Sequence, residues 1–125
     1  MHCRVAVDAM GGDHAPGVIV RGAVEAVLQD PDVSLVLVGD AERIDSELSS
    51  LQPINDRIRV VHASESIGMD EHPVAALRRK KDSSLLRMVQ LAADGEVDAV
   101  VSAGNTGALV VAASLKLRTL AGISR

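Results

Sequence analysis

The residues best suited to chemistry in this sequence lie in the segment Asp8–Pro16, which holds the paired glycines Gly11 and Gly12. Glycine lets a backbone approach a ligand closely, and the N–H groups at a helix start carry partial positive charge. A helical pattern begins at Pro16, so this segment favours a phosphate or another anion, to which His14 is expected to donate a hydrogen bond.

The aspartates of this segment argue against a bare phosphate cradle. Asp8 and Asp13 would repel an anion, so we expect Asp8 to accept bonds from loop N–H groups or to hold a substrate hydroxyl or amide. The alternative is a tight turn from a strand into a helix, with His14 solvated and no ligand.

A second glycine-containing segment, Ser102-Ala103-Gly104-Asn105-Thr106-Gly107, follows an apolar run and precedes an apolar helix. It offers two hydroxyls and an amide around two glycines. Such groups stabilise phosphate oxygens or a developing oxyanion without a formal charge. The alternative is a simple helix cap at Asn105 or Thr106, although a cap needs only one such residue.

Four consecutive cations, Arg78–Lys81, lead into an Asp-Ser-Ser sequence that ends with Ser83 and Ser84. On charge alone, such a run is a solvated helix face. Asp-Ser-Ser can also begin a new helix, which would place Lys80 and Lys81 beside a helix N-terminus. That arrangement suits a phosphate group or an acidic partner protein, so both lysines and both serines are candidate substrate ligands.

Short apolar runs alternate with helical patterns along the chain. The apolar runs predict strands buried on both faces, at Cys3–Val7, Ser34–Val38, Ile58–His62 and Val97–Val101. The helical patterns cover Pro16–Gln29, Ala41–Leu51, Pro73–Asp94 (as two helices or one broken near Asp82) and Thr106–Leu117. The last helix is apolar nearly all round and is expected to be buried. This alternation predicts an α/β fold with a parallel sheet, helices on both faces and ligands at the carboxyl ends of the strands.

Composition narrows the function classes. The chain has 125 residues, a length typical of one domain, and it contains no Phe, Tyr or Trp. Without aromatic side chains it lacks platforms for base stacking, and its formal net charge of −4 gives no attraction to nucleic acid, so no nucleic-acid partner is expected. The single cysteine, Cys3, fits a reducing cytoplasm and is expected to be a small core residue.

Several site types are disfavoured. His62 and His72 have no companions at metal-ligand spacing, so we expect no metal. A Walker loop and a Gly-x-Gly-x-x-Gly motif are missing from the sequence, which weakens ATP and NAD interpretations, and no cofactor is expected. The longest apolar stretch, Ala108–Ala113, is too short to span a bilayer and no signal peptide is visible, so a cytoplasmic location is predicted.

Three segments together resemble the bacterial phosphate acyltransferase family, the acyl-carrier-protein:phosphate acyltransferases of phospholipid synthesis. The resemblance rests on Val7–Pro16, Arg78–Ser84 and Val101–Leu109, in this order over essentially the whole chain. Family members are much longer, so residues 1–125 look like the N-terminal part of a single α/β acyltransferase domain. The implied fold is Rossmann-like α/β/α with a mostly parallel sheet, similar to phosphotransacetylases and to isocitrate or isopropylmalate dehydrogenases.

The resemblance implies transfer of a long-chain acyl group from the phosphopantetheine thioester of acyl carrier protein to inorganic phosphate, giving acyl-phosphate. Phosphate is then the nucleophile, so neither a metal nor a covalent enzyme intermediate is required. The site must hold a dianion near a carbonyl and stabilise an oxyanion. For those contacts we expect Ser102, Asn105, Thr106 and the N–H groups of Gly104 and Gly107.

The other loop is expected to form the facing wall through Gly11, Gly12 and His14, with Asp8 or Asp13 orienting it. Ser102, Asn105 and His14 are the candidate catalytic residues. Lys80 and Lys81 are expected to hold phosphate, the pantetheine phosphate or the acidic carrier protein.

The resemblance also implies a homodimer at full length, a membrane-bound glycerol-phosphate acyltransferase as a partner and peripheral contact with the inner membrane face. Two alternatives stay open. One is a phosphotransacetylase-type enzyme that uses acyl-CoA. The other is a non-catalytic module that binds carrier protein, which becomes the better hypothesis if the natural chain ends at Arg125.

Overall fold

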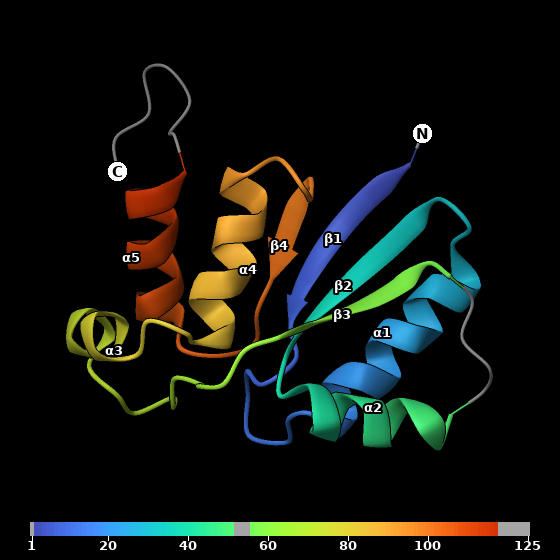
Figure 1. The fold of residues 1–125 in the computed structure, drawn as a ribbon, viewed down its shortest axis with the longest axis horizontal. Helices are drawn as coiled ribbons and strands as arrows, with labels where there is room; N and C mark the ends of the chain where they lie inside the picture. The colour runs from blue at the N-terminus through green and yellow to red at the C-terminus, as the bar shows by residue number, and fades with distance from the viewer. Residues whose placement is uncertain (1, 52–55, 118–125) are drawn as a thin grey trace.

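The computed structural model describes residues 2–51 and 56–117, in which strands and helices alternate (Figure 1). The strands are β1 (Cys3–Asp8), β2 (Val33–Gly39), β3 (Ile58–His62) and β4 (Ala99–Val101). The helices are α1 (Gly17–Gln29), α2 (Ala41–Ser49), α3 (Pro73–Arg79), α4 (Ser84–Ala93) and α5 (Thr106–Lys116). The predicted alternation is confirmed, and the segment between Pro73 and Asp94 forms two helices.

The strands of the described residues form one parallel sheet in the order β3-β2-β1-β4. Val5 of the inner strand β1 pairs with Leu35 of β2 on one side and with Ala99 of β4 on the other. The chain thus steps from β1 outward to β3 and then returns to place β4 on the opposite side of β1. Such a reversal leaves a crevice at the carboxyl ends of the two strands that flank it. The predicted Rossmann-like α/β/α architecture is confirmed.

Helices cover both faces of the sheet, α1 and α2 on one face and α3, α4 and α5 on the other (Figure 1). Successive residues of β2 serve opposite faces, as the pleat of a strand requires. Leu35 and Leu37 belong to the core under α1 and α2, whereas Val36 and Val38 belong to the core under α4. Each fully buried aliphatic side chain contributes about 1.5–3 kcal/mol. The two cores therefore hold the helices against both faces of the sheet without any aromatic residue.

The expectations for the last strand and the last helix were partly wrong. The strand is Ala99–Val101 rather than Val97–Val101, and Val101 is 54% exposed instead of buried. Among the described residues β4 lies at an edge of the sheet, so one side of it has no neighbouring strand.

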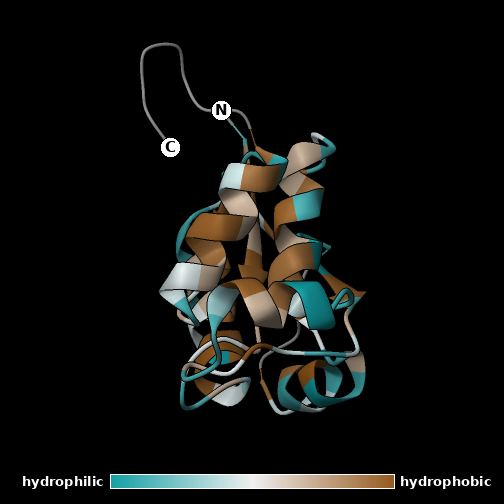
Figure 2. Cartoon of the chain, turned by 90° about the vertical axis from the view of Figure 1, so that its left-hand side faces the viewer, coloured by the Kyte–Doolittle hydropathy of each residue, from teal (hydrophilic) through white to brown (hydrophobic). Residues whose placement is uncertain are grey.

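The helix α5 is not buried all round. Only Ala108 and Ala112 of this helix are buried, whereas Val110 and Leu115 are 59% and 74% exposed. Figure 2 shows hydrophobic colour over much of α5 on the side of the molecule that faces the viewer. An apolar sequence indicates that a helix favours nonpolar neighbours on all sides. In the described part of the chain, however, the main neighbours of α5 are α3 and α4, so its other side stays exposed.

No helix of the described residues is long and apolar enough to cross a membrane.

Candidate functional site

Two glycine loops meet at the carboxyl ends of β1 and β4. The first glycine loop (Asp8–Pro16) follows β1, and the second (Ser102–Gly107) follows β4. They touch backbone to backbone, because a Cβ built on Gly11 would lie 2.8 Å from the Gly104 nitrogen, and one built on Gly104 would lie 3.2 Å from the Gly11 Cα. A side chain at either position would push the loops apart. The two segments that the sequence singled out therefore form one site, and glycine is what allows their contact.

Asp8 joins both loops to a third segment. It is the last residue of β1 and is only 4% exposed. Its Oδ1 accepts hydrogen bonds from the Met10 N–H at 3.1 Å and from the Ser84 hydroxyl at 2.6 Å. Its Oδ2 accepts a bond from the Ser102 hydroxyl at 3.1 Å. Ser84 is the first residue of α4, so the positive end of that helix also faces the carboxyl group.

Ser83 and Ser84 lie in the interior and bond within the protein. The Ser83 hydroxyl caps α4 by accepting a bond from the Leu86 N–H at 3.2 Å, and the Ser84 hydroxyl donates to Asp8. The two serines are 0% and 1% exposed. The predicted helix start is confirmed. A phosphate in solution does not reach either hydroxyl in this arrangement, so the serines support the site from beneath.

Ser102 has a fixed hydroxyl. It donates to Asp8 and accepts a bond from the Gly104 N–H at 3.1 Å. The residue as a whole is partly exposed. Of the three serines predicted to bind substrate, Ser102 is the one that the structure places at the surface of the site.

Asn105 serves as both a helix cap and a loop anchor. Its Oδ1 accepts a bond from the Ala108 N–H at 3.1 Å, which caps α5. Its Nδ2 donates to the carbonyl oxygens of Gly68 at 3.1 Å and Glu71 at 2.8 Å. The residue is 6% exposed. Both amide protons are therefore engaged, and contact with an oxyanion requires one of these bonds to break.

Both glycine loops also carry residues that solvent reaches. Asp13 and His14 are exposed in the first glycine loop, and Thr106 and Gly107 are exposed in the second. Gly12 has a φ of 97°, in the left-handed region that favours glycine. Thr106 and Gly107 belong to the first turn of α5, where free N–H groups of a helix attract anions.

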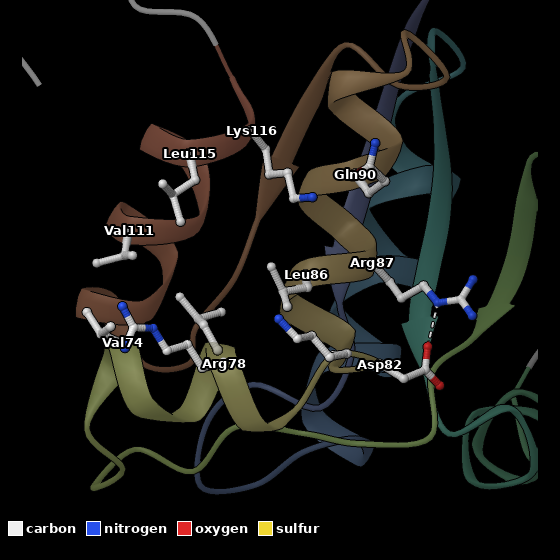
Figure 3. Close-up of a pocket in the computed structure, with 11 residues that line it drawn as sticks. Val74, Arg78, Asp82, Leu86, Arg87, Gln90, Val111, Leu115 and Lys116 are labelled. Atoms are coloured by element: carbon white, nitrogen blue, oxygen red, sulfur yellow. Dashed lines mark hydrogen bonds and ion pairs between the residues drawn. The ribbon is translucent and has the colours of Figure 1, made fainter.

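The ammonium group of Lys80 is engaged in an ion pair. Its Nζ donates to Glu71 Oε2 at 2.7 Å and to the Ser66 carbonyl at 2.7 Å. The Gly68 N–H, and after it the Lys80 ammonium, keep the pKa of the Glu71 carboxyl below its usual value. Lys80 thus fixes the segment before α3. Lys81 is exposed and lines a groove between α3, α4 and α5 (Figure 3).

Asp82 forms a second polar junction at the start of α4. It accepts bonds from the Ser64 hydroxyl at 2.6 Å and the Ser64 N–H at 2.9 Å, and it pairs with Arg87 at 2.6 Å. The Ser64 hydroxyl, then the Ser64 N–H and the Arg87 guanidinium, hold the pKa of Asp82 well below its usual range. This junction fastens the segment after β3 to the helix that supports Asp8.

Sequence analysis did not single out Glu71, which the structure places at the centre of a network. Glu71 accepts from Gly68, Arg79 and Lys80 through its side chain and from Asn105 through its backbone carbonyl. The sequence shows only an Asp-Glu pair, Asp70 and Glu71, several residues before the cations, and nothing in it indicates that Glu71 pairs with Arg79 and Lys80. Within residues 2–51 and 56–117, no cluster of three or more His, Cys, Asp or Glu side chains is placed to hold a metal.

A family model described as a fatty acid synthesis protein matches residues 3–125 of this chain. Relatives named phosphate acyltransferase align with nearly the whole chain. The sequence is 48% identical over 125 residues to the one from Magnetococcus marinus and 49% identical over 122 residues to one from Desulfitobacterium hafniense. Against one from Francisella tularensis it is 43% identical over 132 aligned residues.

The lengths differ strongly in these alignments. The matches cover 100%, 98% and 100% of this chain, but only 36%, 36% and 38% of the three relatives. The chain therefore spans little more than a third of the length of these relatives.

Proposed function

The chain belongs to the fatty acid synthesis protein family, and on this premise we propose that it contributes to acyl transfer to inorganic phosphate. The acyl donor in this proposal is a long-chain thioester of acyl carrier protein, and the product is an acyl-phosphate for phospholipid synthesis. Its relatives carry the name phosphate acyltransferase. The chain spans 36% of the length of the first of these relatives. The activity proposed here is therefore that of a full-length protein, to which this chain contributes a part.

One observation supports this function best: two glycine loops joined at the switch point of the sheet, with the start of α5 beside them. The first glycine loop carries the exposed His14, and the second carries the exposed Thr106. The two loops touch through Gly11 and Gly104. A helix start attracts the charge of a phosphate dianion. A rigid backbone around it lowers the entropy cost of placing the dianion against a carbonyl.

The proposed reaction balances without a cofactor. A phosphate oxygen attacks the thioester carbonyl carbon and forms a tetrahedral oxyanion. The oxyanion collapses, the carbon–sulfur bond breaks, and the carrier leaves as a thiol that takes the proton of hydrogen phosphate. The Gly107 N–H and the Thr106 hydroxyl are the proposed oxyanion and phosphate donors, whereas the Gly104 N–H already donates to the Ser102 hydroxyl.

Other residues have positioning roles in this proposal. Asp8 orients the Ser102 hydroxyl, to which it is bonded at 3.1 Å. Asn105 holds the start of α5 and the segment 68–71 together, so it acts on the reaction through the loop geometry. His14 is proposed to donate to a phosphate oxygen, and Asp13 to orient the first glycine loop.

We extend the proposal to the setting of the whole protein. It would act in the cytoplasm as a homodimer, with peripheral contact at the inner membrane face. A membrane-bound glycerol-phosphate acyltransferase would take up the acyl-phosphate. These statements rest on the family resemblance.

The decisive experiment measures phosphate-dependent release of carrier thiol from palmitoyl-acyl carrier protein. It is run on this chain and on the longer Magnetococcus marinus relative, with and without inorganic phosphate. We expect phosphate-dependent release by the relative. Replacing the residue of the relative that aligns with Asn105 by alanine should lower its rate roughly tenfold to a thousandfold, because the loop that positions the donors loses its anchor.

Two results would count against this function. A relative that prefers acetyl-CoA to the acyl carrier protein indicates a phosphotransacetylase-type enzyme. Thiol release that proceeds equally well without phosphate indicates thioester hydrolysis instead. If the relative is active and this chain only binds carrier protein, the chain acts as a binding module.

A further inference from the structure

A groove with a volume of about 840 Å³ lies between α3, α4 and α5, on the outer side of these helices (Figure 3). Its walls are mostly apolar and come from all three helices, through Val74, Leu77, Leu86, Val111 and Leu115. Leu115 is 74% exposed and Val74 is 38% exposed, so nonpolar surface is left in contact with water. Exposed apolar surface of this kind, framed by polar residues, is typical of a protein-binding site.

The rim of the groove is positively charged in a chain whose formal net charge is −4. Arg78, Lys81, Arg87 and Lys116 line it, together with the single carboxylate Asp82. Arg87 is neutralised by Asp82 at 2.6 Å. Within the described part of the chain, Arg78, Lys81 and Lys116 form no ion pair. Three positive charges are therefore available to an acidic partner.

The arrangement of these charges fits an extended anion. Arg78 belongs to α3, Lys81 to the turn after it and Lys116 to the end of α5. Figure 3 shows Arg78 beside α3 and Lys116 at the other end of the groove. A single phosphate needs cations that converge on one point, whereas cations spread along an apolar groove match an amphipathic helix with acidic flanks.

We propose that this groove binds an acidic amphipathic helix of the acyl carrier protein. The identity of this partner rests on the proposed function. Nonpolar side chains of the helix would enter between Leu86 and Leu115, and its carboxylates would meet Arg78, Lys81 and Lys116. A second copy of this chain is a poorer occupant, because the two basic rims would face each other. Exposed ion pairs contribute little each, so the complex is weak and sensitive to salt.

The test measures binding of unacylated acyl carrier protein to the 125-residue chain by isothermal titration calorimetry. No phosphate and no thioester are present, so the result does not depend on catalysis. The double variant R78A/K81A removes two charges from the rim. The matched control R21A/R43A removes two exposed charges from α1 and α2 on the other face of the sheet.

We expect R78A/K81A to weaken binding roughly tenfold and to flatten its salt dependence, while R21A/R43A binds within about twofold of the parent chain. Leu115→Ser should weaken binding several-fold at every salt concentration, because it removes nonpolar contact rather than charge. Leu115 is exposed, so this variant should keep the parent's unfolding midpoint, which thermal denaturation checks.

The proposal is overturned if the carrier protein does not bind, or if both double variants lose the same affinity. Concentration-dependent dimerisation that Leu115→Ser abolishes would assign the groove to a second copy. Binding to phosphatidylglycerol vesicles that R78A/K81A abolishes, with carrier binding unchanged, would assign it to a lipid surface. Phosphate-dependent acyl transfer by the longer relative, with carrier affinity unaffected by the equivalent rim substitutions, overturns the groove and leaves the proposed function standing.

Discussion

Asp8 shows how one buried carboxyl group organises the candidate site. Two hydroxyls and one backbone N–H donate to it, and these donors come from the segments after β1, after β4 and at the start of α4. A buried acceptor with several donors is costly to remove, because each donor is left without a partner. The geometry of the glycine loops thus depends on a residue that solvent hardly reaches.

Replacing Asp82 by asparagine should change stability in a pH-dependent way. The folded-state pKa of Asp82 is lowered, first by the Ser64 hydroxyl, below the value of about 3.9 expected in an unfolded chain. The folded state therefore favours the ionised carboxylate, which stabilises the protein. This stabilisation is complete at a pH above the unfolded-state pKa and is lost as the pH falls towards the folded-state pKa. D82N should be less stable than the parent at pH 7, and the gap should narrow below about pH 4.

Urea unfolding at pH 7, 5, 4 and 3 measures this gap as a difference in the free energy of unfolding. Asp45, an exposed aspartate of α2, supplies the control variant D45N. A gap between D82N and the parent that stays constant from pH 7 to pH 3 would contradict the assignment.

Two glycine-to-alanine substitutions should have opposite effects on stability. At Gly11 the new Cβ would meet the Gly104 nitrogen at 2.8 Å and the Ser102 oxygen at 3.0 Å, which should cost about 1–3 kcal/mol. At Gly22, inside α1, it would meet nothing within 4 Å and should gain about 0.5–1 kcal/mol through helix propensity. Chemical denaturation of both variants checks the signs. A stabilising Gly11→Ala would show that the loops do not touch.

At the scale of elements, the second glycine loop and α5 are fastened by one side chain. Asn105 satisfies an N–H at the start of α5 and two carbonyl groups of the segment 68–71. The same segment is fixed from the other side by Glu71, which pairs with Lys80 at the end of α3. Asn105 and Glu71 therefore tie the loop before α3 to the start of α5.

Asn105→Asp should separate the cap from the anchor. Aspartate keeps the acceptor for the Ala108 N–H but replaces the two donors with oxygen, which faces the carbonyls of Gly68 and Glu71. We expect amide hydrogen exchange to stay slow at Ala108 and to become faster at Gly68 and Glu71. Asn105→Ala, which loses the cap as well, should cost about 1 kcal/mol more. Equal protection of Gly68 in N105D and the parent would rule out the anchor.

At the scale of the molecule, two elements near the end of the described chain are only partly covered. β4 is at the edge of the described sheet, and α5 leaves Val110 and Leu115 exposed. Relatives are nearly three times as long, since 125 residues cover 36% of the first of them. The carboxyl ends of β1 and β4 and both glycine loops lie within this chain.

The two sides of α5 should respond differently to substitution in this chain. Val110→Ser, on the exposed side, should change the free energy of unfolding by less than about 0.5 kcal/mol. Ala112→Leu, on the side that is 0% exposed, should cost about 1–3 kcal/mol through overpacking against the neighbouring helices. Thermal and urea unfolding give both values. A costly Val110→Ser would mean that this face is covered in solution.

The sequence by itself determined the elements and their type. Val-rich runs and helical periods placed all four strands and the two-helix break near Asp82 close to their observed positions. The polar motifs Asp8–Pro16 and Ser102–Gly107 also identified the family, because residue types and spacing are local properties of the chain. Composition accounted for cores built without aromatic side chains.

Only the tertiary structure decided which polar groups remain available. Ser84 and Asn105 are buried and bond to Asp8 and to the segment 68–71, whereas Thr106, next to Asn105 in the sequence, is exposed. Lys80 is paired, whereas its neighbour Lys81 lines a groove with residues of α5 that are thirty or more positions away in the sequence. Hydrogen bonds and ion pairs of this kind join residues distant in sequence, so no local pattern records them.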